Sequence, residues 1–508
     1  MEEEALEVEA LKILVESLIS YKGRVVGTPA AYYPKKNRKS NIKQNKVSEE
    51  VLNYDQVFIR DFVPVALLFL IKGDFDIKLD GGKEVNVRGK EIVQDFLEMT
   101  LELHQQERPK AFLNTGRVLM PASFKIIKNK NGKEKLEPDF GQHAIARVTP
   151  VDSSLWWIIL LRAYWKATGN TTLVHRADFQ EGIRLILELC FSDRFDREPT
   201  LLVPDGACMI DRRMGIYGHP LEIQVLFYAA MRAADELLDR KNFTNKDIIP
   251  AVEKRVAALA NHIRDEYWMD MVRLNKIYQY DVEEYGATAI NKYNIYASSI
   301  PYANLDEWLS ENSGYLVGNL GASQIDFRFF SLGNLMAIIC SLVRQDQSKA
   351  IMQLIKERRQ YLIGKMPLKI CYAALEGRDW EIVTGCDPKN RHWSYHNGGS
   401  WPVLMWMLAA AARKVSQEFH EEGYINLTNK VIEAAGKRLK KDEWPEYYDG
   451  LSGHLIGREA RKNQTWTIAG YLLAKELLAD SGLKHLELIK FNEKTYRKKS
   501  SPEANKVT

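Results

Sequence analysis

The chain has 508 residues, of which 45% are apolar and 27% are charged, and its formal net charge is +4. This composition is typical of a globular protein, and the length suits about three average domains or one large core. The small net charge gives no reason to expect a nucleic acid or an anionic membrane as a partner.

The five cysteines are widely spaced, and no two of them form a CxxC pair. This pattern favours free thiols in a reducing compartment. The N-terminus is acidic and lacks the basic and apolar regions of a signal peptide, and no apolar run is long enough to span a bilayer. We therefore predict a cytoplasmic protein.

Helical periodicity dominates the chain. Apolar residues recur at helical spacing in about eleven segments, which are 51–72, 92–106, 153–168, 181–191, 221–238, 248–264, 326–343, 350–358, 401–416, 425–440 and 465–478. Asp152 and Thr244 are the predicted N-caps of the helices that follow them. Helices that arrive in pairs, separated by long loops, favour a ring of helical hairpins with a functional site at one mouth.

Strand signals are few. Strands at 76–79 and 84–87 are predicted to form one hairpin, and strands at 123–128 and 133–136 a second. We divide the chain into an N-terminal helix with a basic loop, a helical body and a flexible polar tail, with the bounds 1–49, 50–485 and 486–508.

Three segments in the first half of the chain could carry chemistry. The adjacent Arg60 and Asp61 fit either a surface ion pair, worth about 0–1 kcal/mol, or a polar pair that lines a pocket. Asp152 fits an N-cap, but His143 and Trp156 in the same stretch make it denser in polar and aromatic residues than a cap requires. Asp211 follows an apolar stretch and precedes two arginines, which fits a structural salt bridge or a catalytic acid.

Two further segments lie in the second half. His396, Asn397 and Trp401 surround two glycines, which let a backbone approach a ligand closely. His392 and His396 stand four residues apart, but no third ligand is near them, so we predict no metal site. Glu446 lies between Pro445 and two tyrosines, and Gln464 lies further along the chain.

The carboxylates of Asp211 and Glu446 suggest a reaction class. A carboxylic acid in an apolar pocket can keep its proton at neutral pH. Two carboxyl groups that face one sugar–oxygen bond are what glycoside hydrolysis needs. The sequence has no GxxxxGK[ST], GxGxxG, GxSxG or HExxH motif, which disfavours nucleotide-binding, dinucleotide-binding, serine hydrolase and zincin functions.

Taken in order, these segments resemble the neutral/alkaline invertases, glycoside hydrolase family 100. The matching strings span residues 54 to about 478 and are IRDFVP, HAIARVTPVDSSLWWIILLRAYW, MIDRRMGIYGHPLEIQ, NRHWSYHNGGSWPVLMW, WPEYYDG and QTWTIAGYLLAKEL. Two places depart from the family pattern, namely Asn463, where Tyr is expected, and the loop 112–119.

The resemblance implies an (α/α)6 barrel that hydrolyses sucrose to glucose and fructose with inversion, without a metal or other cofactor. Similarity to helical-barrel trehalases and α-glucosidases makes Asp211 the general acid and Glu446 the general base. The expected substrate-binding residues are Arg60, Asp61, His143, Asp152, Trp156, His396, Asn397, Trp401 and Gln464.

Three alternatives stay open. A related barrel hydrolase of trehalase or glucosidase type would share the two carboxylates, whereas a sugar epimerase would be expected to work with a histidine pair. A sugar-binding protein would keep the barrel without turnover. A homo-oligomer is also left open, because the sequence does not give the oligomeric state.

Overall fold

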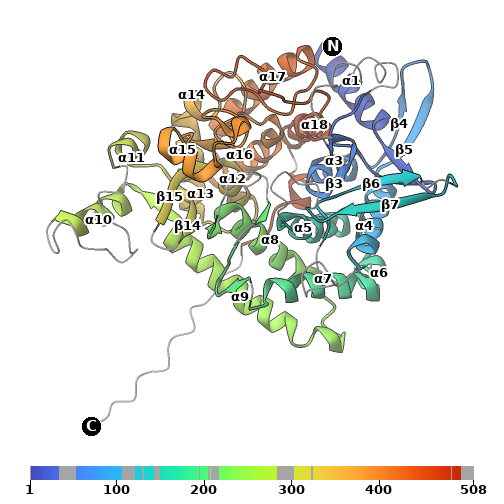
Figure 1. Ribbon diagram of the computed structural model, residues 1–508, viewed down its shortest axis with the longest axis horizontal. Coiled ribbons are helices and arrows are strands. Elements are labelled where there is room, and N and C mark those ends of the chain that lie inside the picture. The colour runs from blue at the N-terminus through green and yellow to red at the C-terminus, as the bar shows by residue number, and fades with distance from the viewer. Residues whose placement is uncertain are drawn as a thin grey trace, which may run out of the picture.

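The computed structural model describes residues 2–33, 53–105, 120–128, 131–141, 149–193, 195–203, 206–207, 217–282, 302–321, 324–481 and 483–493. Within these ranges helices form the core, as predicted, and the sheets are small (Figure 1).

Six helices form a ring in the described part of the chain. Each helix packs against the next, and the last packs against the first, so the ring is closed. In order around the ring they are α3 (Ile59–Lys72), α5 (Asp152–Thr168), α8 (Leu221–Leu237), α12 (Ser331–Ile339), α16 (Met405–Phe419) and α18 (Thr465–Ala479).

The helices of the ring are buried on nearly all sides. Every residue of α8 from Leu221 to Ala234 is buried, and so is every residue of α18 from Thr465 to Ala474. A helix that is hydrophobic all round is stable only inside a core. The composition of these segments therefore assigns them to the inner layer.

A second helix precedes each helix of the ring along the chain and lies outside it. In α7 (Ala177–Cys190) the buried apolar residues recur at three- and four-residue spacing, as in Phe179, Ile183 and Ile186, which gives one apolar stripe facing the core. The other outer helices are α1 (Glu2–Glu16), α4 (Gly89–Gln105), α9 (Ile248–His262), α13 (Gln345–Glu357) and α17 (Gly423–Lys441).

The N-termini of the inner helices meet at one end of the ring, called the mouth below. Arg60 at the start of α3 bonds to Asp152 at the start of α5 at 2.9 Å, and its guanidinium lies 5.8 Å from the ring centre of Trp466 in α18. A Cβ added to Gly333 in α12 would lie 2.7 Å from Leu221 at the start of α8. This close approach requires glycine at position 333.

The C-terminal described residues pack at the opposite end of the ring. Phe491 is 1% exposed, and the guanidinium of Arg162, late in α5, lies 3.9 Å from its ring centre. The Ser341 hydroxyl, just after α12, donates to the Phe491 carbonyl at 2.6 Å. Leu486, Ile489 and Phe491, at the start of the segment predicted as a tail, are therefore buried against the ring.

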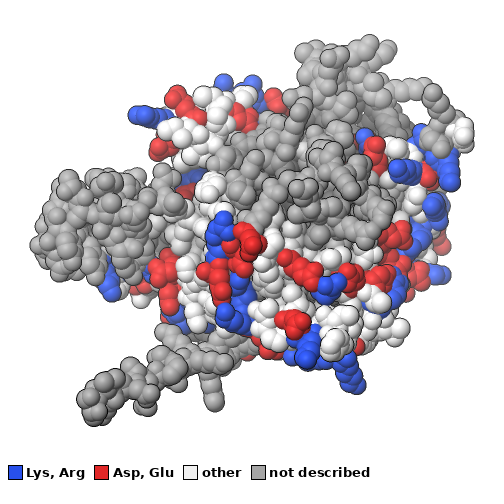
Figure 2. All heavy atoms as spheres, turned by 60° about the horizontal axis from the view of Figure 1, so that its bottom comes forward, with Lys and Arg blue, Asp and Glu red and all other residues white. Residues whose placement is uncertain are grey.

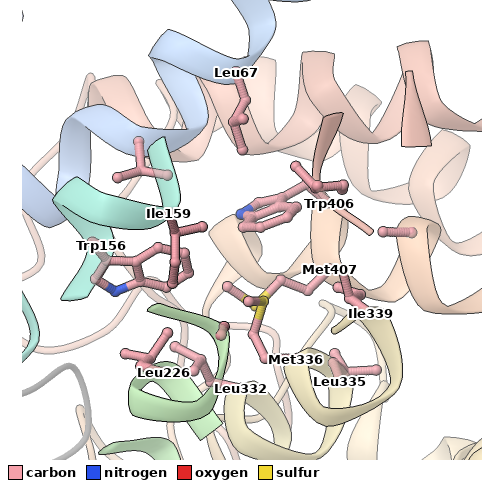
Figure 3. Close-up of a cluster of buried hydrophobic side chains, with 14 of the residues drawn as sticks. Leu67, Trp156, Ile159, Leu226, Leu332, Leu335, Met336, Ile339, Trp406 and Met407 are labelled. Carbon is pink, nitrogen blue, oxygen red and sulfur yellow. The ribbon is translucent and has the colours of Figure 1, made fainter. Parts of the chain in front are cut away.

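The interior of the ring is filled by large apolar side chains. Figure 3 shows Leu67 from α3, Trp156 from α5, Leu226 from α8, Met336 from α12 and Met407 from α16 pointing toward one another. All of them are buried. The middle of the ring is thus a packed core and not an open channel.

Both predicted hairpins are confirmed. Strands β4 (Asp74–Lys78) and β5 (Glu84–Arg88) pair antiparallel, and so do β6 (Ser123–Lys128) and β7 (Glu134–Asp139). The second hairpin also pairs with β3 (Val57–Phe58). The predicted helix 51–72 is therefore wrong over the described residues 53–58, and the observed helix begins at Ile59.

The sequence did not predict the longest hairpin, formed by β14 (Gly314–Gly321) and β15 (Gln324–Phe330). The predicted helix 326–343 is wrong over its first five positions, since residues 326–330 belong to β15. Asp326 and Arg328 form an ion pair at 2.6 Å, which fits the two-residue period of a strand. Helices α10 (Met271–Val282), α11 (Tyr302–Trp308) and α15 (Gly377–Thr384) were not predicted either.

The two predicted N-caps are wrong. The residue that precedes α5 is Val151, and Asp152 is the first residue of the helix, where its carboxylate binds Arg60. Thr244 lies in a short 3-10 turn, and the residue that precedes α9 is Asp247.

The surface carries charges of both signs. On the face in Figure 2, Lys and Arg side chains of the described residues are interspersed with Asp and Glu. None of the helices in the described ranges has the length and apolar run needed to cross a membrane.

Candidate active site

Most of the predicted site residues in the described ranges lie at the mouth of the ring. Arg60 and Asp61 begin α3, Asp152 begins α5, and Gln464 directly precedes α18. Trp401 lies just before the turn that leads into α16. Because helix N-termini carry partial positive charge, a ring of them stabilises carboxylates placed there.

Arg60 is the centre of a buried ion cluster. Its Nη1 donates to Asp152 Oδ2 at 2.9 Å and its Nε to Asp61 Oδ1 at 3.2 Å, and the three side chains are 16%, 4% and 13% exposed in the order Arg60, Asp152, Asp61. Burial alone would lower the Arg60 pKa, but Asp152, Asp61 and Glu222 outweigh it and hold that pKa above its usual value. The pair is thus not the exposed surface pair that one interpretation allowed.

Glu446 lies in the connection between α17 and α18 and is 5% exposed. Its backbone N–H donates to the Arg461 carbonyl at 2.8 Å. The Tyr54 hydroxyl lies 3.0 and 3.1 Å from the two carboxylate oxygens. Lys389 Nζ lies 3.9 Å from Glu446 Oε2 and donates to the Tyr54 hydroxyl oxygen at 3.3 Å. One donor and one cation therefore fix this carboxylate.

Aromatic rings hold these groups in place. The Lys389 ammonium lies 4.1 Å from the ring centre of Tyr395, and the Arg461 guanidinium lies 5.4 Å from the ring centre of Tyr54. Burial raises the pKa of the Tyr33 hydroxyl, Arg461 opposes this shift, and Glu446 adds to it. Tyr33 is thus close enough to Glu446 to interact electrostatically.

The loop with His396 and Asn397 supports Lys389 rather than standing open. Asn397 Oδ1 accepts from the Leu375 N–H at 2.7 Å, and its Nδ2 donates to the Leu375 and Asn390 carbonyls at 2.9 and 3.1 Å. The His396 N–H donates to Asn390 Oδ1 at 3.0 Å, and its ring stacks on Tyr395. Both N–H groups of the Asn397 amide are thus used by this loop.

The predicted aromatic residues are buried. Trp401 is 1% exposed, stacks on Tyr447 and donates from Nε1 to the Tyr395 carbonyl at 3.0 Å. Trp156 and Trp466 line a cavity of about 20 Å³ beside Arg60, which has room for about one water molecule.

Three buried donors at this end of the ring have no hydrogen-bond partner within the described residues. They are Trp156 Nε1, Gln464 Nε2 and Trp466 Nε1. Buried polar groups in native proteins are nearly always paired, so these donors mark positions where a bound water or ligand would be stabilised.

Two predicted site residues, Asp211 and His143, and the divergent loop 112–119 lie outside the described residues. The motif that follows Asp211 is described from Tyr217 onward. It enters α8 at the mouth, with Glu222 in the first turn and fully buried.

The sequence interpretation missed Tyr33, Tyr54, Lys389 and Arg461 as neighbours of Glu446. Tyr54 lies at the start of the segment that contains Arg60, but a single tyrosine gives no signal of its own. Lys389 lies in a short 3-10 turn (Pro388–Asn390) just before the histidine loop. Among the described residues, no group of three His, Cys, Asp or Glu side chains is arranged as a metal site.

The family model for alkaline and neutral invertase matches residues 10–481 of the chain. The chain belongs to this family. The predicted family is thereby confirmed.

Several relatives match the sequence of this chain over most of their length. The chain is 51% identical to neutral/alkaline invertase 1, mitochondrial, of Oryza sativa subsp. japonica, over 93% of this chain and 70% of that protein. It is 48% identical to cytosolic invertase 1 of the same organism, over 96% of this chain and 80% of that protein. It is 47% identical to probable alkaline/neutral invertase F of Arabidopsis thaliana, over 98% of this chain and 92% of that protein.

Solved structures support the fold. A glycosidase variant in complex with glucose superposes with a TM-score of 0.51 at 10% identity, covering 94% of this chain and 96% of that chain. A second glycosidase variant gives a TM-score of 0.52, also at 10% identity, covering 94% of this chain and 96% of that chain. The names of the relatives include mitochondrial, chloroplastic and cytosolic invertases, so family membership does not fix the compartment.

Proposed function

We propose that this protein hydrolyses sucrose to glucose and fructose with inversion of configuration, and that its ring of helices is an (α/α)6 barrel. In the described part of the chain, six inner and six outer helices that alternate in sequence support the barrel. The names of the invertase relatives support sucrose as the substrate.

The observation that carries the mechanism is the Glu446 carboxylate, held by Tyr54 and Lys389 near the mouth of the ring. In the proposed reaction Glu446 removes a proton from a water molecule, which attacks the anomeric carbon of the glucosyl unit. Asp211 donates a proton to the bridging oxygen, which leaves on fructose. An ionised carboxylate suits the base, because it has to accept a proton.

The buried cluster around Arg60 is the proposed sugar-binding surface. Carboxylates such as Asp61 and Asp152 accept hydrogen bonds from sugar hydroxyls, and the guanidinium keeps both of them oriented. Trp156 and Gln464 would add donors, since their buried N–H groups have no partner within the described ranges. His143, His396, Asn397 and Trp401 are kept as proposed binding residues, with Asn397 and Trp401 acting through the loops that they hold.

The remaining proposals follow from the same assignment. Residues 50–485 form the catalytic domain, no cofactor or metal takes part, and sucrose is the only proposed partner. We also keep the cytoplasm as the proposed compartment. A trehalase-like hydrolase or a sugar epimerase is the second candidate, and a sugar-binding protein is the third.

The test is to incubate sucrose with the wild-type chain, Asp211→Asn and Glu446→Gln, and to follow the products by proton NMR. The wild type should release β-glucose before mutarotation, and each variant should lose at least about a hundredfold in turnover with an unchanged circular dichroism spectrum. Initial α-glucose would contradict inversion, and absence of free fructose would favour the epimerase or the binding protein. Trehalose and maltose in parallel separate the hydrolase alternatives.

A further inference from the structure

A second cavity lies on the outer side of the ring, between α14 (Arg359–Leu362; Figure 1) and the turn at 451–453. Its volume is about 340 Å³, within the range of small-molecule sites. None of the residues that line it belongs to the group around Glu446. Its polar side chains come from Gln360, Lys365, Lys369, Ser400 and Ser452, and it has no acidic lining residue within the described part of the chain.

Lys369 is the buried charge of this cavity. It is 5% exposed, and no carboxylate of the described residues lies within ion-pair distance of its ammonium group, which donates to the Tyr361 carbonyl. Burial lowers the pKa of Lys369 to about 8, with Asp449 opposing this shift. The Asp449 carboxylate itself accepts from the N–H and hydroxyl of Ser452 at 2.9 and 2.7 Å. A buried ammonium without a close counter-ion is costly.

Two of the residues that line the cavity also carry backbone N–H donors. The N–H groups of Lys365 and Met366 have no acceptor among the residues that the structure describes. A Cβ added to Gly453 would lie 3.1 Å from the Met366 nitrogen and 3.6 Å from the Lys365 nitrogen. Gly453, which has φ of +64°, therefore packs close to both backbone nitrogens, and a larger residue there would crowd them. Successive backbone N–H groups of this kind form anion sites in many proteins.

We propose that this cavity is a binding site for a phosphate monoester of about the size of a sugar phosphate. The two ammonium groups, the two backbone N–H groups and the Ser400 hydroxyl are the donors that phosphate oxygens take. A phosphate would supply the counter-charge that Lys369 lacks, and the remaining volume accommodates a small polar body. Neutral glucose would supply no such charge.

The occupied cavity would contact the segment that carries Glu446. The Ser400 N–H donates to the Tyr448 carbonyl at 2.9 Å, and the Tyr448 N–H donates back to the Ser400 carbonyl at 2.8 Å. Tyr448 is two residues from Glu446, and Trp401 donates to the Leu368 carbonyl at 2.8 Å. A ligand on Ser400 and Lys369 therefore reaches the catalytic segment through one pair of backbone hydrogen bonds.

Calorimetric titration of the full chain with inorganic phosphate and with glucose 6-phosphate tests the proposal, with glucose and with sodium chloride at matched ionic strength as controls. Both phosphates should bind with a dissociation constant of about 1 mM or tighter, and neither control should bind at this site. Lys369→Met and Lys365→Gln should each weaken phosphate binding about tenfold or more, because charge-assisted hydrogen bonds are lost.

Two matched variants locate the site. Lys484→Gln, an exposed lysine elsewhere, and Lys389→Gln, beside Glu446, should leave phosphate binding unchanged. Loss of binding in Lys389→Gln, or no saturable binding at about 10 mM phosphate, where a site with a 1 mM constant would be roughly 90% filled, would overturn the proposal. If Lys369→Met does not fold, Lys365→Gln decides together with acylation of Lys369 followed by mass spectrometry, which phosphate should slow severalfold. Acylation unaffected by phosphate would count against the site.

Discussion

The Tyr54 hydroxyl lies within hydrogen-bond distance of both carboxylate oxygens of Glu446, at 3.0 and 3.1 Å, although 392 positions separate the two residues. The contact joins the segment before the first inner helix to the segment before the last one. It exists only because the ring closes, with α18 packed against α3. Closure of the ring and assembly of the proposed base are thus one structural event.

Replacing Tyr54 by Phe should therefore lower turnover of sucrose. A hydrogen bond to a charged group is worth about 1.5–3 kcal/mol, so we expect kcat to fall about 10- to 150-fold while the circular dichroism spectrum stays unchanged. Tyr424→Phe is the control, because its hydroxyl donates to Gln353 at 3.3 Å on outer helices. A Tyr54→Phe enzyme with near-normal kcat would show that this hydroxyl does not serve the reaction.

Replacing Lys389 by Gln should lower kcat about tenfold or more, because its cation lies near both Glu446 and the Tyr54 hydroxyl. The two residues act on one carboxylate, so the double variant with Tyr54→Phe should lose less than the two single losses combined. Lys414→Gln is the control, since Lys414 is equally buried but pairs with Glu418 at 3.0 Å on α16. It should lower stability and leave kcat of the folded enzyme unchanged. Fully additive losses would mean that Tyr54 and Lys389 act independently.

Helical periodicity predicted most helices of the ring. The prediction failed where the buried apolar residues of a strand continue the spacing of a helix. The stretch 326–330 is apolar enough to continue the helical pattern of α12, but Asp326 and Arg328 pair on one side of a strand. The hairpin of β14 and β15 depends on pairing with a distant segment, which local periodicity does not contain.

The residues of the candidate site were likewise predicted only in part. The sequence identified Arg60 and Asp152 as unusual polar residues, but their 2.9 Å bond depends on α3 and α5 lying side by side. Lys389 and Tyr54 belong to no recognisable spacing with Glu446, and only the closed ring brings them together. The sequence identified residues with suitable chemistry, but it did not show which residues contact one another.

An experiment on Asp152 distinguishes a residue that only caps a helix from one that is the counter-ion of Arg60. Ser is as good an N-cap as Asp, so Asp152→Ser should be nearly neutral if the residue only caps α5. As the counter-ion of buried Arg60, its loss should lower the free energy of unfolding by about 3 kcal/mol, measured by denaturant titration. Asp178→Ser is the control, because Asp178 also lies in the first turn of a helix and pairs with an arginine, Arg176, but at the surface. It should cost less than about 1 kcal/mol. Equal costs in the two variants would contradict the counter-ion role.

Lys369 should make the stability of the protein depend on pH above neutrality. Its pKa is about 8 in the folded chain and has a model-peptide value of 10.5, so between these values the unfolded chain binds more protons than the folded one. The free energy of unfolding then contains a contribution that rises with pH from about 8 to 10.5. Below pH 8 the buried ammonium costs the folded state up to about 3 kcal/mol.

Lys369→Met removes this cost, so the variant should be more stable than the wild type at pH 7 and the difference should shrink toward pH 10. Denaturant titrations of both proteins at pH 7, 8, 9 and 10 measure it, and taking the difference cancels the tyrosines that titrate above pH 10. A difference that stays constant over this range, or a variant less stable at pH 7, would mean that the Lys369 ammonium is not destabilising where it lies.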